Sequence, residues 1–370
     1  MYFYTMSKGI QAARGRQAIK NTQSVGVAQP NAIQAARYSI GMAEILADLA
    51  GGDFADVDDV IRRACKTGSA VVDAAFANTY LRSGKRLRPG LTLAMAKAMG
   101  CTDQATAVGA AAAAELMHIA TLIHDDIIDD SDTRRGRPAL HKQIGAKRAI
   151  VVGDFVLAAG ATVAAELGAE FAKIWAEAFL RVCRGQHSEF DLTHDPDIDT
   201  DTFLDYVGLK TAALISASCE LGAVSANGTE GQRLAARRYG WDFGLAFQMM
   251  DDLLDIVGDP IALGKPTHQD IPNGIYSVAV IDALTVEGSV NSVHLRDAIA
   301  NEDHERAYYL VASSNSVVSA LALAREHAQG AGQSMSGYAS DRLVQVPSVY
   351  VEETAKKLHL ADRSGGSDSD

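Results

Sequence analysis

The sequence predicts an all-α protein that folds as one large helical bundle. Long segments repeat apolar residues at the helical period, whereas the alternation typical of β-strands is almost absent. Only 8 prolines occur among 370 residues, and several of them lie between the periodic segments. Alanine-rich stretches such as 104–124 let neighbouring helices approach closely. These observations favour a single, tightly packed helical domain.

A series of helices is expected along this domain, with different sequence character at the two chain ends. The expected helices are 34–50, 56–80, 89–98, 104–129, 147–167, 169–192, 201–225, 231–257, 276–286, 291–300, 303–311 and 315–329. Six prolines are expected to separate helices and not to interrupt them: Pro89, Pro138, Pro196, Pro260, Pro266 and Pro272. Residues 1–33 carry basic but no acidic side chains and predict a flexible basic arm. We expect residues 34–362 to form one domain and residues 363–370 a disordered polar tail.

Charge balance and cysteine spacing exclude several classes of function. The chain has 34 basic and 46 acidic residues and a net charge of −12, so no nucleic-acid partner is expected. The cysteines are widely spaced and form no CxxC pair, which favours a reducing, cytoplasmic location. No segment is expected to span a membrane, because the most apolar stretch, 105–123, contains Glu115 and His118 and continues into Asp125.

Two aspartate clusters of identical spacing are the strongest functional signal. Each has the pattern DDxxD and ends a long apolar run; their members are Asp125, Asp126 and Asp129 in the first cluster and Asp251, Asp252 and Asp255 in the second. On a helix, positions i and i+4 share a face and i+1 lies beside it, so each cluster gathers three carboxylates. Carboxylate oxygens are the ligands that Mg²⁺ prefers, and Mg²⁺ bridges carboxylates to phosphates.

One such cluster alone can be a solvated acidic helix end. The basic residues that follow both clusters favour a metal–phosphate site instead. Arg134 and Arg135 follow the first cluster, and Lys265 follows the second. Arginine and lysine bind phosphate oxygens, so acidic and basic groups together suit a metal-bound diphosphate.

Further candidate residues each have a structural alternative. Lys85 and Arg88 lie in a compact basic motif at 84–89 that can also be a solvated loop. His118 lies about two turns before Asp125, yet a lone histidine in an apolar helix is more often a core residue. Lys210 and Thr211 interrupt an apolar run, where a lysine can simply extend to water. Gln248, one turn before Asp251, needs a polar partner if it is buried.

The order of the motifs resembles that of the polyprenyl synthetase family of trans-isoprenyl diphosphate synthases. The shared motifs are GKRLRP at 84–89, ELxH at 115–118, DDxxD with RRGxP at 125–138, GDxxLA at 153–158, KTAxL at 210–214, FQxxDDxLD at 247–255 and GKxxxxD at 264–270. The resemblance covers roughly residues 35–360 and is specific because so many motifs keep one order. It implies the isoprenoid synthase type of bundle, around a central apolar cavity, and a homodimer.

The resemblance implies a role for each matching residue. The six aspartates match ligands of Mg²⁺, with about three ions per active site. Lys85, Arg88, His118 and Arg135 match residues that hold isopentenyl diphosphate. Arg134, Lys210, Gln248 and Lys265 match residues around an allylic diphosphate, and Thr211 matches a helix kink near the reacting carbon. Ile275 stands where a lysine is common, which removes one possible diphosphate contact.

The implied reaction is a head-to-tail condensation of isopentenyl diphosphate with an allylic diphosphate of C5 to C20, with transient membrane contact for product release. Carbonyls near Lys210, Thr211 and Gln248 would stabilise the allylic cation, and the departing diphosphate would take the proton. Three alternatives stay open, and one of them, a plain helical scaffold, would require the motif order to be a coincidence. A class I terpene cyclase would not need Lys85, Arg88 and His118, and a non-catalytic subunit of a heteromeric synthase should have lost one aspartate cluster.

Two positions before the first cluster predict the product length. In the family, the residues four and five before the first aspartate line the path of the growing chain, and bulky aromatics there stop growth. These residues are Thr121 and Ala120, both small. We therefore expect a product of C20 or longer, and the absence of an aromatic there favours C30 or above.

Overall fold

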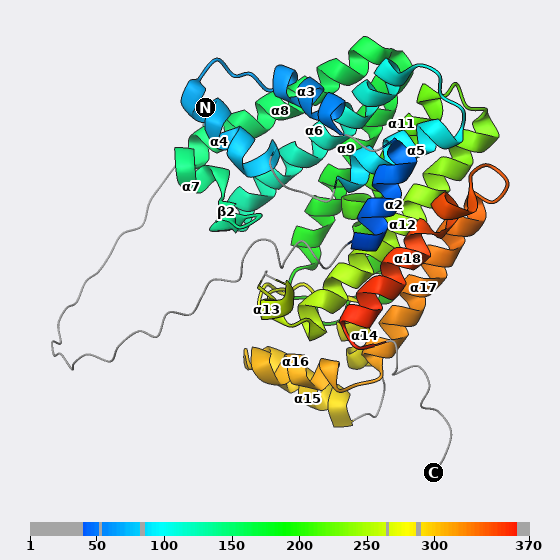
Figure 1. Cartoon of the computed structure of the whole chain (residues 1–370). Coiled ribbons are helices and arrows are strands. Elements are labelled where there is room, and N and C mark those ends of the chain that lie inside the picture. The colour runs from blue at the N-terminus through cyan, green and yellow to red at the C-terminus, as the bar shows by residue number, and fades with distance from the viewer. Residues whose placement is uncertain (1–39, 52–53, 82–85, 264–265, 286–289, 361–370) are drawn as a thin grey trace, which may run out of the picture.

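The fold is helical throughout the part of the chain that the structure describes. The structure is a computed structural model that describes residues 40–51, 54–81, 86–263, 266–285 and 290–360 (Figure 1). Within these ranges the only sheet is a short antiparallel hairpin of β1 (Thr133–Arg134) and β2 (Arg137–Pro138). The predicted all-α class is confirmed. The predicted basic arm and polar tail lie outside the described residues.

The helices follow one another with short connections. In chain order they are α2 (Ile40–Ala50), α3 (Ala55–Ala64), α4 (Ala70–Phe76), the π-helical turn η2 (Ala77–Leu81), α5 (Leu87–Ala98), α6 (Gln104–Ile128), α7 (Leu140–Ile144), α8 (Ala146–Leu167), α9 (Ala169–Leu192), α10 (Thr200–Val207), the π-helical turn η3 (Gly208–Ala212), α11 (Ala213–Ser225), α12 (Glu230–Val257), α13 (Pro260–Leu263), α14 (Val278–Thr285), α15 (Val290–Ala300), α16 (His304–Ala312), α17 (Ser316–Ser334) and α18 (Asp341–Lys357).

The long helices match the sequence-based expectation closely, whereas several segments differ from it, among them the short helices α7 and α13, which were not predicted. The predicted helix 56–80 is divided into α3, α4 and η2, because Gly68 adopts a φ of 83° that a continuing helix cannot accommodate. Helix α18 was not predicted. Its interior contains Pro347, and proline disfavours a helix interior. Leu343, Val346 and Tyr350 nevertheless repeat at helical spacing and are buried, which favours a helix.

Helix α6 lies among α3, α8 and α9 (Figure 1) and contributes to two apolar clusters. In one cluster Leu116, Ile119 and Ala120 pack with residues of α3, α4 and α8. The other cluster is a set of buried side chains that we call the inner column. Its members come from α6, α8, α9 and α11: Ala110, Ala113, Ala114, Met117, Ala164, Phe171, Ile174, Trp175, Ala178, Val182, Leu214, Ala217, Leu221 and Val224.

Close backbone contact fixes α11 against α12. A Cβ on Gly244 would lie 2.5 Å from the Cα of Ala212, and a Cβ on Gly240 would lie 2.5 Å from the Cα of Ser216. Only glycine allows this approach. The contact holds η3, which contains Lys210 and Thr211, next to the helix that carries the second aspartate cluster.

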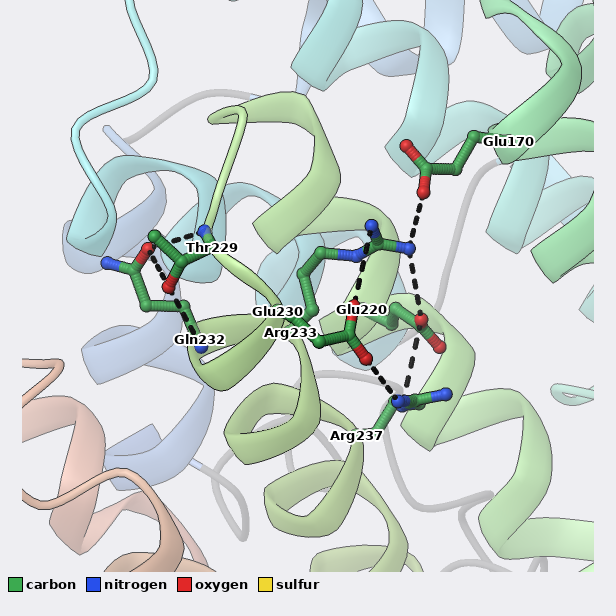
Figure 2. A network of polar contacts seen from close by, with 7 residues as sticks. All are labelled: Glu170, Glu220, Thr229, Glu230, Gln232, Arg233 and Arg237. Atoms are coloured by element: carbon green, nitrogen blue, oxygen red, sulfur yellow. Dashed lines mark hydrogen bonds and ion pairs between the residues drawn. The ribbon is translucent and has the colours of Figure 1, made fainter.

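Ion pairs join the beginnings of α9 and α12 to α11, far from the aspartate clusters. Arg233 approaches Glu170 to 2.5 Å and Glu220 to 3.8 Å, and Arg237 approaches Glu230 to 3.4 Å (Figure 2). A capping box between Thr229 and Gln232 starts α12 beside these charges. Arg233 lies eighteen residues before Asp251, about 27 Å along the helix at about 1.5 Å per residue. The network therefore closes the end of the bundle opposite the clusters.

Among the residues that the structure describes, three helices are long and apolar enough, by length and composition, to cross a membrane. This differs from the expectation that no segment can span one. The three helices are α6, α8 and the continuous helix Thr200–Ser225. Within the fold, 78% and 83% of the apolar windows of α6 and Thr200–Ser225 are buried, against 33% for α8. Most of the hydrophobicity of the first and third helices thus forms the core, whereas α8 presents an apolar surface outward.

Candidate active site

The two aspartate clusters end two central helices. Asp125 and Asp126 lie in the last turn of α6, and Asp129 is its C-cap residue. Asp251, Asp252 and Asp255 lie in the last two turns of α12. Burial raises the pKa of Asp125 to about 6, and the charge of Lys210 opposes this shift. Burial and then the charge of Asp270 raise the pKa of Asp252 well above its usual range. Carboxylates in such surroundings need a cation nearby.

Lys210 and Glu189 lie between the clusters. The Nζ atom of Lys210 donates to both carboxylate oxygens of Glu189, at 2.6 and 2.7 Å. Besides burial, which raises the pKa of Asp125 and Asp129, the charge of Lys210 lowers it and the charge of Glu189 raises it. Burial and then the charges of Asp252 and Glu189 raise the pKa of Tyr206. Glu189 is thus close to the first cluster and, through Tyr206, to Asp252 of the second, which is consistent with one common region between them.

A chain of hydrogen bonds links η3 to the second cluster. Thr211 donates its hydroxyl hydrogen to Gln248 Oε1 at 2.9 Å, and Gln248 Nε2 donates to Asp252 Oδ1 at 2.8 Å. The predicted kink at Thr211 is present as the π-helical turn η3. A π-turn widens a helix and frees backbone carbonyls, and such turns are common at functional sites. A Cβ on Gly185 of α9 would lie 2.2 Å from the backbone nitrogen of Lys210, so the turn is seated directly on α9.

One aspartate of the first cluster is fully engaged by protein donors. Asp126 is 1% exposed. Its Oδ1 accepts from Arg134 Nε at 2.7 Å, and its Oδ2 accepts from the Tyr80 hydroxyl at 3.1 Å. The backbone carbonyl of Tyr80 in turn accepts from Arg135 at 3.1 Å. Asp126 therefore orients Arg134 directly, and Tyr80 connects Asp126 with Arg135.

One aspartate of the second cluster is engaged in the same way. Asp255 Oδ1 accepts from the backbone nitrogen of Gln269 at 2.8 Å. Its Oδ2 accepts from the backbone nitrogen of Asp270 at 3.2 Å and from the Tyr308 hydroxyl at 2.8 Å. The Tyr308 ring stacks on His268 at 4.1 Å between centroids, and its hydroxyl also accepts from the nitrogen of Ile271. Asp255 and Tyr308 thus fasten the segment that follows Lys265.

A separate group of arginines lies beside His118. Arg86 contacts Glu115 at 3.3 Å and Asp58 at 2.6 Å. Burial lowers the pKa of Arg88 to about 10, which leaves the side chain charged at neutral pH, and its Nε has no hydrogen-bond partner among the described residues. Burial and then Arg88 and Arg135 lower the pKa of His118 well below its usual range. A neutral imidazole next to two buried cations is suited to an anionic ligand.

The structure brings most predicted site residues together, with some exceptions. Lys85 and Lys265 lie outside the described residues. Thr121 is half-buried one turn below Asp125, whereas Ala120 packs into the cluster formed with α3, α4 and α8. Ile275 lines a small pocket with Glu189 and Tyr206. Sequence reasoning missed Glu189, Tyr80 and Tyr308, although Glu189 follows Gly185 by one helical turn and lies on the same face of α9.

The carboxylates suit magnesium that is shared with a phosphate ligand. Within the described ranges, no three carboxylate, imidazole or thiol side chains converge closely enough to hold a metal alone. Mg²⁺ is usually held by one or two carboxylates together with substrate phosphates and water. Asp252 Oδ2 is buried and has no hydrogen-bond partner in the described part of the chain, so an acceptor remains for a cation or a metal-bound water.

Comparison with known proteins places this site in a family. The Polyprenyl synthetase family matches residues 70–312. The chain is 34% identical over 280 residues to a prenyl transferase of Porphyra purpurea, covering 74% of this chain and 86% of the relative. It is 35% identical over 281 residues to a geranylfarnesyl diphosphate synthase of Aeropyrum pernix, with coverages of 73% and 86%.

Solved structures agree with the sequence relatives. A polyprenyl synthase of Caulobacter crescentus, in complex with calcium and isoprenyl diphosphate, superposes with a TM-score of 0.77 at 30% identity and covers 86% of this chain and 97% of that protein. A decaprenyl diphosphate synthase of Rhodobacter capsulatus gives a TM-score of 0.76 at 28% identity, with coverages of 85% and 99%. The chain is thus a prenyltransferase that belongs to the polyprenyl synthetase family.

Proposed function

We propose that the chain is a magnesium-dependent trans-isoprenyl diphosphate synthase that adds isopentenyl diphosphate to an allylic diphosphate. One observation carries this proposal: two aspartate clusters border one region, and a second, separate group of buried cations lies beside His118. Two diphosphate substrates need two anion sites. A terpene cyclase has one diphosphate substrate and no use for the second site, and a non-catalytic subunit has no use for two intact clusters.

The residues between the clusters act on the allylic substrate. Asp125, Asp129 and Asp251 hold the metal–diphosphate, and Arg134 and Lys210 contact its oxygens. Bound magnesium supplies charge neutralisation of the leaving diphosphate. Asp126 and Asp255 orient Arg134 and the 266–276 segment, and we assign them no metal contact because protein donors engage both of their carboxylate oxygens.

Cation stabilisation and addition follow from the residues around η3. Two kinds of oxygen face the carbon from which the diphosphate departs. They are the backbone carbonyls of the widened turn at Lys210 and Thr211, and Oε1 of Gln248. Arg88, His118 and Arg135 hold isopentenyl diphosphate so that its double bond meets this carbon. The departing diphosphate takes the proton. The apolar inner column beneath the site excludes water, which would otherwise quench the cation.

A product assay tests the synthase. Purified protein is incubated with isopentenyl diphosphate, Mg²⁺ and each allylic diphosphate from C5 to C20, and products are identified by mass spectrometry. We expect products of C20 or longer that require both substrates and disappear with chelator. A cyclic hydrocarbon formed without isopentenyl diphosphate would favour the cyclase instead.

We further propose that the chain forms a homodimer through α8 and α9. The two helices pack side by side. Their outer faces expose Val151 and Phe155 on α8 and Leu180 and Phe190 on α9, at 64%, 37%, 57% and 51%. Exposed apolar side chains on two neighbouring helices support an interface on this face. Sedimentation at micromolar concentration should give a dimer, and a monomer that binds lipid vesicles would favour a membrane surface.

The free thiols support a cytoplasmic location. Cys65, Cys101, Cys183 and Cys219 are all unpaired, and Cys183 is exposed on α9. Free cysteines persist in reducing compartments. Fractionation of the native host should place the protein in the soluble cytoplasmic fraction, and recovery from an oxidising compartment would contradict this proposal.

A further inference from the structure

The π-helical turn η2 (Ala77–Leu81) contacts residues of both proposed substrate sites. Three of its side chains, Thr79, Tyr80 and Leu81, are buried. None of the motifs at 84–89, 115–118 and 125–138 includes this turn. Single π-helical turns are common at functional sites, so the contacts of η2 bear on the reaction.

Tyr80 reaches the first aspartate cluster through its side chain. The side chain is fully buried, and its ring lies 5.6 Å from that of Phe76, measured between centroids. The Tyr80 hydroxyl donates to Asp126 Oδ2 at 3.1 Å, and Asp126 Oδ1 accepts from Arg134 Nε at 2.7 Å. Asp126 is therefore held between Tyr80 and the arginine that we assign to the allylic diphosphate.

The backbone of the same turn reaches the arginines beside His118. Carbonyl groups at the end of a helix have no partner within it and need donors from elsewhere. Arg135 Nη1 donates to the carbonyl of Tyr80 at 3.1 Å, and Arg86 Nη2 donates to the carbonyl of Leu81 at 3.2 Å. A guanidinium has several N–H donors in a planar fork, so Arg135 can hold this carbonyl and a phosphate together.

We propose that Tyr80 is a positioning residue that links the two substrate sites. Its hydroxyl holds Asp126 and its carbonyl holds Arg135, and one buried residue carries both groups. A metal–diphosphate that fixes Arg134 and Asp126 therefore also places Arg135 for isopentenyl diphosphate. This inference rests on the proposed synthase activity and adds a dependence of one site on the other. Such linkage is reciprocal, so isopentenyl diphosphate strengthens binding at the clusters by the same factor.

The affinity for isopentenyl diphosphate, with the allylic site empty and filled, measures the link. Calorimetry on the full chain gives its Kd in Mg²⁺ alone and in Mg²⁺ with saturating, unreactive farnesyl thiolodiphosphate. We expect the analogue to lower this Kd by about tenfold, near the low end of coupling between sites, because one hydroxyl carries the link. Tyr80→Phe keeps the ring and the carbonyl and removes only the hydroxyl, so the ratio of the two Kd values should fall toward one.

Matched variants separate the link from a general loss of packing. Tyr308→Phe removes the corresponding hydroxyl from Asp255, and Tyr239→Phe removes a buried hydroxyl that donates to the carbonyl of Leu343 at 2.8 Å. Both variants should keep the wild-type ratio once the analogue is saturating.

Arg135→Lys tests the link from its other end. Lysine keeps the positive charge but replaces the planar fork with a single ammonium group, which cannot hold the Tyr80 carbonyl and a phosphate in the same geometry. The ratio of the two Kd values should therefore fall toward one in this variant as well. Thermal unfolding of each variant shows whether the fold persists.

The outcomes separate the link from the synthase assignment. A ratio of one in the wild type, the wild-type ratio in folded Tyr80→Phe, or an equal loss in Tyr308→Phe would overturn the link and leave the synthase intact. If Tyr80→Phe does not fold, the wild-type ratio and Arg135→Lys decide the matter. A wild type that binds no isopentenyl diphosphate in either state and forms no condensation product would overturn the synthase assignment and, with it, the link.

Discussion

The two aspartate clusters share a spacing and differ in how their carboxylates are used. In the first, the middle residue, Asp126, is buried between Arg134 and Tyr80. In the second, the last residue, Asp255, is held by two backbone nitrogens and the Tyr308 hydroxyl. A motif repeated in sequence is therefore not repeated in structure. In the arrangement that we propose, each cluster keeps carboxylates for the metal–diphosphate and uses one to fasten a neighbouring segment, a different one in each case.

The largest expected effect comes from the carboxylates that we assign to metal. Asp125→Ala and Asp251→Ala should each lower kcat by about 10²–10³-fold or more, because each removes charge stabilisation of the leaving diphosphate. Steady-state kinetics with an excess of Mg²⁺ checks this, and unchanged thermal unfolding shows that the fold persists. Near-wild-type turnover in either variant would remove that cluster from the site.

The next-largest loss of kcat should come from Gly185, on which the turn η3 packs. Gly185→Ala places a methyl group 2.2 Å from the nitrogen of Lys210, so η3 must shift. Displacement of a positioned group by about 1 Å costs about 10²-fold in rate. We expect kcat to fall by that order. The control is Gly100→Ala, at a turn where an added Cβ meets nothing within 4 Å; it should lower stability and leave kcat alone. Equal kcat losses in the two variants would show that the contact between Gly185 and η3 has no special role in catalysis.

Arg88 lies beside His118 and belongs to neither aspartate cluster. Its replacement should therefore affect the binding of isopentenyl diphosphate and not that of the allylic substrate. Arg88→Ala should raise KM for isopentenyl diphosphate by about 30-fold, because a hydrogen bond to a charged group contributes about 2 kcal/mol. KM for the allylic substrate should change little. Kinetics with each substrate varied in turn measures the ratio, and an equal rise in both constants would contradict separate sites.

The smallest effect comes from the hydroxyl that fastens the second cluster. Tyr308→Phe keeps the ring stacked on His268 and removes the hydrogen bonds to Asp255 and Ile271. KM for the allylic substrate and the Mg²⁺ requirement should rise by about 5–10-fold, since a typical hydrogen bond contributes about 1 kcal/mol. KM for isopentenyl diphosphate is the internal control. A fall in stability with no change in Mg²⁺ requirement would indicate a purely structural role.

The sequence predicted the fold class and most helices because their apolar periodicity is strong and continuous. The DDxxD spacing also fixes the helix face on which each aspartate lies, so the position of each carboxylate on its helix could be predicted. It could not predict that Asp126 and Asp255 are engaged by protein donors. Those partners, Tyr80 and Tyr308, lie 46 and 53 residues away and meet the aspartates only through tertiary packing.

The product path shows the same limit. Residues just before the first aspartate are local in sequence, so Thr121 and Ala120 could be assigned to α6 directly. Their packing partners depend on how the other helices surround α6, and Ala120 belongs to the cluster that packs with α3, α4 and α8.

The central claim is that the two clusters divide their carboxylates between metal and scaffold. A crystal structure with Mn²⁺ in place of Mg²⁺ and an unreactive allylic diphosphate analogue tests it most directly, because anomalous scattering locates each ion. The claim predicts metal contacts from Asp125, Asp129 and Asp251, with Asp126 still bound to Arg134 and Tyr80 and Asp255 still bound to Tyr308. A metal ion coordinated by Asp126 or Asp255, with those protein partners displaced, would contradict it.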